Sequence, residues 1–153
     1  MSNEYIDVVS LMGSLHRQFV GIVNVELGRL GIQDINGVQG LMLFKIGDVR
    51  LSVGELTLRG CYLGSNVSYN VKKLAENGYI VQTRSVHDRR SIQVRLIEKG
   101  HNLRDRLAMM LREHVAMLSE HSITDDDLKA VCGTLRSIER SWTNANAPLR
   151  LPS

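Results

Sequence analysis

The stretch that decides the fold is residues 64–96, GSNVSYNVKKLAENGYIVQTRSVHDRRSIQVRL. It predicts one helix of about three turns followed by a two-stranded hairpin. Ser65 is the expected N-cap, and Asn77 with Gly78 supplies the left-handed residue that commonly ends a helix. Three aliphatic residues recur at helical spacing and should form a stripe that packs inward: Val67, Val71 and Leu74.

The opposite face of this helix carries polar side chains with almost no acid among them. Asn can bond the edge of adenine bidentately, Ser and Tyr can reach bases or phosphates, and Lys neutralises phosphate. The candidate contacts to DNA on this helix are Ser65, Asn66, Ser68, Tyr69, Asn70 and Lys73. An ordinary solvated helix face is the alternative interpretation.

The hairpin that follows has a cationic loop. Residues 79–84 and 91–97 are rich in β-branched side chains and predict two strands. A basic tip of this kind fits the narrow, electronegative minor groove of DNA, and Asp88 can bond a neighbouring guanidinium and fix its direction. A helix followed by a basic hairpin is the outline of a winged helix-turn-helix. The candidate DNA contacts in and beside the loop are Arg84, His87, Asp88, Arg89 and Arg90.

The flanking segments predict long helices. Apolar residues at helical spacing indicate a first helix over about residues 4–30 and further helices over about 99–143. The small winged core, about 34–98, cannot cover their apolar faces, so we expect these helices to mediate dimerisation. The predicted fold class is mainly α with a small β-hairpin, a winged helix-turn-helix core flanked by long N- and C-terminal dimerisation helices. We expect a single domain over 1–143 and an extended or disordered tail over 144–153.

Local signals indicate where the remaining helices begin. A second helix is expected over about residues 37–46. Ser52 with Glu55 forms a capping box for a third helix, and Thr124 with Asp127 caps a last one. Such side-chain oxygens bond the first amides of a helix, which have no partner within it. The chain therefore alternates short helices in its middle with long helices at its ends.

Residues 51–100 resemble the core of the MarR family of bacterial transcriptional regulators. The resemblance covers about a third of the chain, and its most specific part is the motif that runs from Asp88 through Ser91. It implies that Arg90 enters the minor groove while Asp88 braces it. It also implies that the helix containing Asn66 and Tyr69 enters the major groove. The other matching segments are 51–53, 55–56, 65–74, 77–80, 94–96 and 98–100.

The same resemblance implies an effector. Most regulators of this type lose affinity for DNA when a small aromatic or phenolic molecule enters a crevice between the dimer helices and the winged core. Met and Phe at helical spacing are more often core than pocket, which is the alternative for part of this set. By their position on the first two helices, the candidate ligand-binding residues are His16, Phe19, Met42 and Lys45.

Charge and segment composition favour a phosphate-bearing partner. The net charge is +3, but residues 59–106 contain ten Lys or Arg and four Asp or Glu, a balance of +6, which leaves −3 for the rest. Positive charge concentrated on the helix and hairpin is what phosphate contacts require. We identify no signal peptide and no apolar run near the ~20 residues that a membrane helix needs. The expected location is cytoplasmic, with no membrane partner.

Other kinds of chemistry find little support in the residues. Cys61 and Cys132 form no CxxC pattern, and we expect both to be small buried hydrophobes without a disulfide. The five histidines lack the spacing of a helical metal site, so neither a metal nor another cofactor is expected. No Gly-rich phosphate loop or GxSxG turn is present, which disfavours an enzyme. In the turn before the helix that contains Asn66 and Tyr69, the MarR family usually has an apolar residue followed by Gly. This chain has Gly60 followed by Cys61 there.

The sequence thus predicts a homodimeric, sequence-specific, DNA-binding transcriptional regulator modulated by a small-molecule ligand. Its partner would be double-stranded DNA with a pseudo-palindromic operator, since two symmetric reading heads match two half-sites. Two alternatives remain: a winged-helix adaptor for protein–protein interaction, and a non-specific nucleic-acid-binding protein. An adaptor has no need for three arginines around one loop. A non-specific binder would keep its preference unchanged when Asn66 and Tyr69 are replaced.

Overall fold

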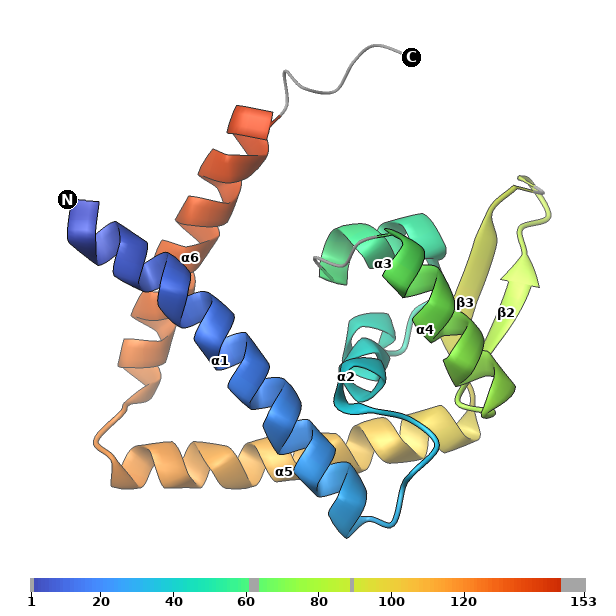
Figure 1. The fold of residues 1–153 in the computed structure, drawn as a ribbon, viewed down its shortest axis with the longest axis horizontal. Coiled ribbons are helices and arrows are strands. Elements are labelled where there is room, and N and C mark those ends of the chain that lie inside the picture. Colours follow the sequence, from blue (N-terminus) through green and yellow to red (C-terminus); the bar gives the residue numbers. More distant parts are fainter. Residues whose placement is uncertain (1, 61–63, 89, 147–153) are drawn as a thin grey trace. The chain divides into compact units, whose positions relative to one another are not determined.

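The computed structural model describes residues 2–60, 64–88 and 90–146 (Figure 1). The chain divides into two compact units at residue 110, within the fifth helix. The elements are α1 (Ser2–Arg29), α2 (Gly37–Ile46), β1 (Leu51–Ser52), α3 (Val53–Gly60), α4 (Gly64–Glu76), β2 (Ile80–Arg84), β3 (Ile92–Leu96), α5 (Glu98–Glu120) and α6 (Asp125–Asn146). The first unit therefore holds the predicted winged core together with α1 and the beginning of α5.

Helix α4 has the predicted inward stripe and the predicted end. The side chains of Val67, Val71 and Leu74 are at most 2% exposed. Gly78 has a φ of 80°, and the amide of Tyr79 bonds the carbonyl of Leu74, which closes the last turn. The helix begins at Gly64, so Ser65 lies within it and is not the residue before it. The turn at residues 61–63, where the chain departs from the family pattern, lies outside the described residues.

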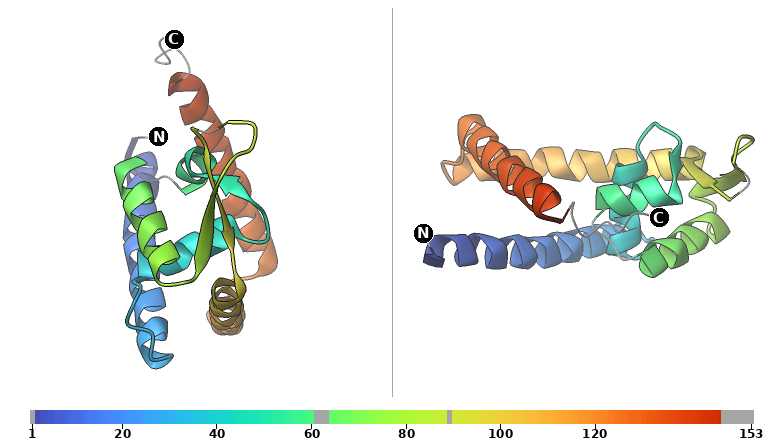
Figure 2. Two further views of the ribbon diagram at one scale, coloured as in Figure 1. Left: turned by 90° about the vertical axis from the view of Figure 1, so that its right-hand side faces the viewer. Right: turned by 90° about the horizontal axis from the view of Figure 1, so that it is seen from above.

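The sheet has three antiparallel strands in the order β1-β3-β2, where the sequence predicted two. In β1, Leu51 lies opposite Val94 of the central strand β3, and on the other side Gln82 of β2 lies opposite the same Val94. Val94 is completely buried, whereas Ile92 at the loop end is 39% exposed. The apolar side chains of β3 are therefore buried only toward the α5 end of the hairpin. The loop between β2 and β3 lies at the end of the hairpin away from α5, as Figure 1 and the left view of Figure 2 show.

The other helix boundaries follow the predicted caps closely. Helix α2 has the predicted bounds, and Asn36 caps it. The hydroxyl of Ser52 accepts from the Glu55 amide at 3.0 Å, at the start of α3. In the second unit, the Asp127 amide donates to the Thr124 hydroxyl at 3.2 Å. Helix α6 continues to Asn146, so the first three residues of the predicted tail are helical, and residues 147–153 lie outside the described part.

Asp34, in the loop before α2, joins that loop to the base of the hairpin and to α5. Its carboxylate accepts from the Tyr79 hydroxyl at 2.8 Å and from the Lys99 ammonium at 3.2 Å. Lys99 also donates to the Asn77 carbonyl at 2.8 Å and lies 4.2 Å from the centroid of the Tyr79 ring. Burial raises the pKa of Asp34, but the bonds from Tyr79 and Lys99 outweigh it and hold that pKa below its usual value. These contacts fix the point where α4, β2 and α5 meet.

Tyr79→Phe is expected to lower the free energy of unfolding by about 1 kcal/mol at neutral pH, because it removes a hydrogen bond to a partly exposed carboxylate. Asp34 is ionised above its unfolded-state pKa of 3.8, so its bonds contribute fully there. Their contribution is lost as pH falls through the lower folded-state pKa, and the gap between variant and wild type should narrow below about pH 4. Urea unfolding at several pH values measures this. Tyr69→Phe, at a 59% exposed tyrosine, should leave stability unchanged. An equal loss in both variants would contradict the assignment.

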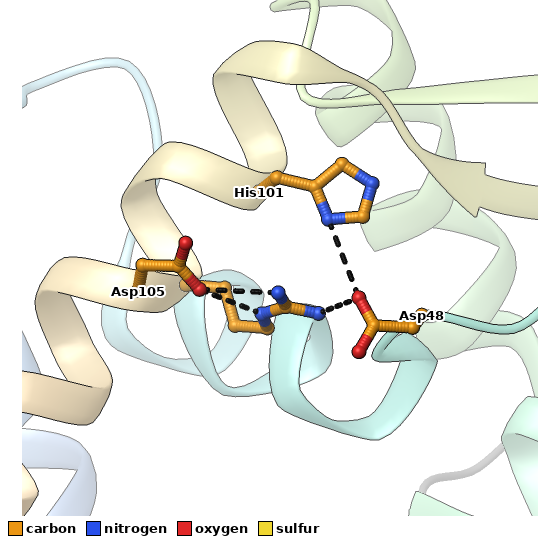
Figure 3. Close-up of polar contacts among 4 residues, drawn as sticks. Asp48, His101 and Asp105 are labelled. Carbon is orange, nitrogen blue, oxygen red and sulfur yellow. Dashed lines mark hydrogen bonds and ion pairs between the residues drawn. The ribbon is translucent and has the colours of Figure 1, made fainter.

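A second polar cluster ties α5 to the segment between α2 and β1 (Figure 3). The Arg104 guanidinium bonds the Asp48 carboxylate at 2.6 Å and the Asp105 carboxylate at 3.1 Å. His101 Nδ1 lies 3.7 Å from the same Asp48 carboxylate. The bond from Arg104 lowers the pKa of Asp48. Arg104 thus joins α5 to the segment before β1, whereas Lys99 joins α5 to the loop before α2. Within the described residues, no helix is both long enough and apolar enough to span a membrane.

Candidate nucleic-acid interface

Helix α4 presents most of its predicted polar residues to solvent. Asn66, Ser68 and Tyr69 are exposed, and the Tyr69 side chain retains 59% of its accessible surface. Lys73 is half-buried: its ammonium lies 3.5 Å from the Glu76 carboxylate and 5.8 Å from the centroid of the Tyr69 ring. The side chain of Ser65 is outside the described residues. The exposed side chains of α4 therefore offer an amide and a phenol one turn apart at Asn66 and Tyr69, and a hydroxyl at Ser68 on another side of the helix.

Asn70 is a correction to the predicted face. Its spacing from Asn66 is one helical turn, which predicts exposure, but the side chain is only 9% exposed. Its Oδ1 accepts a hydrogen bond from Nε2 of Gln39 in α2 at 3.1 Å. The physical reason is tertiary: α2 packs against this side of α4 and supplies a polar partner that the spacing within α4 cannot reveal.

In the loop of the hairpin between Arg84 and Ile92, the described residues 85–88, 90 and 91 are held by local hydrogen bonds. We call β2, this loop and β3 the wing. The amide of Ser85 bonds the Ser91 carbonyl at 3.0 Å, and the Ser85 hydroxyl accepts from the amides of His87 and Asp88 at 3.3 and 3.4 Å. The Asp88 carboxylate accepts from the main-chain amide of Arg90 at 3.0 Å. Asp88 thus braces Arg90 through the backbone, whereas the sequence predicted a bond to a guanidinium.

The predicted DNA contacts in and beside the loop are exposed where the structure describes them. Arg84, His87, Asp88 and Arg90 all lie at the surface, and Arg89 lies outside the described residues. Ser85, which organises the loop, was missed by sequence reasoning. A serine at the first position of a loop often accepts hydrogen bonds from the main-chain amides that follow it. This preference could have identified Ser85.

A cleft of about 620 Å³ separates α4 from the wing. Lys72 from α4 and Arg90 from the wing stand on its two sides, and Ser68 lies one helical turn before Lys72. Lys72 is 73% exposed and was not among the predicted contacts, although its spacing from Ser68 could have indicated it. The cleft combines cations with hydroxyl and amide groups, which is the chemistry that binds a phosphate backbone. Its remaining lining residues are Ser52, Val53, Gly54, Val71, Gln82, Asp88, Ser91 and Ile92.

A second hollow, of about 350 Å³, lies on the α1 and α2 side of α4. It brings His16 of α1 together with Asn66 and Tyr69, and Asn36, Val38 and Asn70 complete its lining. Of the four predicted ligand-binding residues, His16 lines this hollow. Met42 is completely buried, so it belongs to the core and does not line a ligand crevice, as the sequence had predicted it would. Phe19 and Lys45 are not among the lining residues.

Two further predictions concern cysteine and metal chemistry. Cys132, in α6, is exposed, so the expectation that it is buried is wrong. It lies in a helix whose described residues are nearly all exposed or half-buried, so no core is available to cover it. Cys61 lies outside the described residues. Across residues 2–60, 64–88 and 90–146, no three His, Cys, Asp or Glu side chains gather as a metal site would need.

The comparisons with known proteins identify the family. The model of the MarR family matches residues 33–91, which include α4 and most of the wing. Over 141 residues the chain is 38% identical to the exopolysaccharide II synthesis transcriptional activator ExpG of Rhizobium meliloti (strain 1021), covering 92% of this chain and 73% of ExpG. The chain belongs to the MarR family.

Solved structures show that this MarR-family regulator has the family's fold. The transcriptional regulator BldR from Sulfolobus solfataricus superposes with a TM-score of 0.74 at 20% identity, covering 92% of this chain and 99% of BldR. A mutant MarR from E. coli, complexed with operator DNA, superposes with a TM-score of 0.70 at 18% identity, covering 89% and 96%. The predicted winged helix-turn-helix is therefore confirmed, and the protein is a transcriptional regulator of the MarR family.

Proposed function

We propose that this regulator is a homodimer that reads a specific sequence in duplex DNA, with α4 in the major groove and the wing in the minor groove. The observation that carries the proposal is the cleft between them, since it sets Ser68 and Lys72 of α4 opposite Arg90 of the wing. Control of transcription by binding, without catalysis, is the proposed activity. The proposed location is the cytoplasm, where a regulator of this family would meet its DNA.

The two parts of the interface would make different contacts. Asn66 and Tyr69 are exposed on α4 and can reach base edges, where an Asn amide pairs bidentately with adenine. Lys72 and Arg90 face the cleft and would hold the phosphate backbone that passes between α4 and the wing. Arg90 would continue from the wing into the minor groove, whose negative potential attracts guanidinium groups. The brace from Asp88 to the Arg90 amide would aim that side chain.

A second copy of the chain is the partner that best covers the exposed apolar residues of the long helices. In the first unit, α1 leaves Tyr5, Ile6, Leu11, Leu15 and Val25 between 45 and 74% exposed. In the second unit, α5 and α6 leave Val115, Met117, Val131 and Trp142 between 42 and 55% exposed. So many large apolar side chains are typical of an interaction surface. A symmetric dimer would set two reading helices about one DNA turn apart, roughly 34 to 36 Å.

The hollow beside α4 is the proposed site of a small aromatic or phenolic effector. Tyr69 supplies a ring for stacking, and His16 and Asn36 supply polar groups that can orient a hydroxyl or a carboxylate. The same Tyr69 and Asn66 are proposed base contacts. An effector in this hollow would therefore compete with base reading directly.

Asn66→Ala and Tyr69→Ala test whether α4 reads bases. Each lost base contact should reduce discrimination between the operator and a scrambled duplex by about 1 to 3 kcal/mol. Lys72→Ala is the matched control on the same helix, because losing a phosphate contact should weaken binding to both duplexes equally. Fluorescence anisotropy with the two duplexes measures both effects. If all three variants weaken the two duplexes by the same factor, the protein binds nucleic acid without sequence preference and the proposal fails.

A further inference from the structure

A buried hydrogen bond joins α4 to α2 behind the proposed reading face. Gln39 is 5% exposed and Asn70 is 9% exposed, and the Gln39 Nε2 donates to the Asn70 Oδ1 at 3.1 Å. The two residues are 31 positions apart in the chain. An amide pair in such a place is costly unless each group keeps its partner. The pair therefore fixes the position of α4 more narrowly than aliphatic contacts would.

The Gln39 amide is held at both of its ends. Its Oε1 accepts from the main-chain amide of Asn36 at 3.0 Å, and the Asn36 Oδ1 accepts from the main-chain amide of Gln39 at 3.0 Å. The oxygen of Gln39 is thus committed to the cap of α2 while its nitrogen is committed to Asn70. Because the amide group is planar, it cannot turn without losing one of these bonds.

The beginning of α2 is in turn fixed on α1. The Gly37 amide donates to the Asn24 Oδ1 at 2.7 Å. A Cβ at Gly37 would lie 2.6 Å from the Val20 carbonyl oxygen, so the two backbones are in close contact. A continuous set of contacts therefore runs from α1 through the start of α2 to Asn70.

We propose that Asn70 is a positioning residue: its bond to Gln39 sets the orientation of α4, so that base reading depends on a contact that does not touch DNA. Asn70 directly follows Tyr69 and lies one turn after Asn66, the two proposed base contacts. Buried polar pairs can select one packing among several that apolar residues would allow. This inference rests on the proposed DNA-reading function.

The test is a double-mutant cycle measured as binding to the operator and to a scrambled duplex. Gln39→Leu and Asn70→Leu should each lower operator affinity by about 3- to 30-fold, the usual range for residues that couple two sites. Affinity for the scrambled duplex should stay within about twofold, since phosphate contacts are untouched. The double variant should lose no more than either single variant, because both remove the same bond. Asn36→Ala is the matched control: it removes the cap oxygen of α2 but keeps both amides of the pair.

Asn70→Asp adds a readout that does not depend on the leucine variants folding. Its carboxylate can still accept from Gln39, so the ratio of operator to scrambled affinity should be kept, even if the added charge weakens both. Three results would overturn the proposal: leucine variants that keep the wild-type ratio, Asn36→Ala losing as much as Gln39→Leu, or an altered preferred base in Asn70→Leu alone. The last would make Asn70 a base contact. If the wild type itself shows no preference, the DNA-reading function has failed, and this inference falls with it.

Discussion

Arg90→Ala is expected to lower operator affinity roughly 10- to 100-fold, the cost of losing a charge-assisted contact in a groove. The effect should be large because Arg90 lies at the cleft and its main-chain amide, which donates to the Asp88 carboxylate, fixes where its side chain starts. The slope of log affinity against log salt should also fall by about 1, since one phosphate contact is lost. Titrations at several salt concentrations measure both quantities.

Arg95→Ala is the matched control for this prediction. Arg95 is exposed on strand β3 of the same wing, but it does not line the cleft. Both substitutions remove one positive charge from one hairpin, so a general electrostatic effect would be similar for the two. We expect Arg95→Ala to change affinity by less than about threefold. Equal losses in the two variants would show that the wing contributes only net charge.

Gly100→Ala is expected to destabilise the fold by about 3 kcal/mol or more, the upper end of the cost of overpacking. A Cβ on Gly100 would lie 2.1 Å from the Tyr79 carbonyl oxygen, and that oxygen cannot move freely because it also accepts from the Ile97 amide at 3.1 Å. Helix α5 would have to shift away from the base of the wing. Urea unfolding followed by circular dichroism measures the loss.

Gly28→Ala serves as the control for the glycine substitution. Gly28 is also helical, but a Cβ there would meet no atom within 4 Å. Alanine favours a helix over glycine, so this variant should be as stable as the wild type or slightly more stable. Should Gly100→Ala prove as stable as Gly28→Ala, the close contact between α5 and the wing is wrong.

Local sequence signals predicted the elements well because their causes are local. The predicted caps at Ser52 and Thr124 each act within three residues, and Gly78 readily adopts the positive φ that ends α4. Strand β1 was missed because it has two residues and exists through pairing with the distant β3. No pattern within residues 51 and 52 could show that pairing.

The same distinction explains what was predicted of the candidate site. Asn66 and Tyr69 were placed correctly on the exposed face because helical spacing decides that face. Asn70 has the same spacing, but a residue 31 positions earlier buries it. An apolar side chain such as Met42 suits either a ligand pocket or the core. The packing of the other elements buries it in the core. Errors of this kind arise wherever a contact comes from another element.

Selection of bound sequences from a pool of random duplexes is the most direct measurement of the proposed function, because the pool contains every candidate operator at once. A homodimer with α4 in the major groove should enrich one motif with two-fold symmetry and half-sites about 10 base pairs apart, centre to centre. Asn66→Ala should blur that motif while leaving its symmetry intact. A pool that yields no enriched motif, or a motif without two-fold symmetry, would contradict a dimeric, sequence-specific reader.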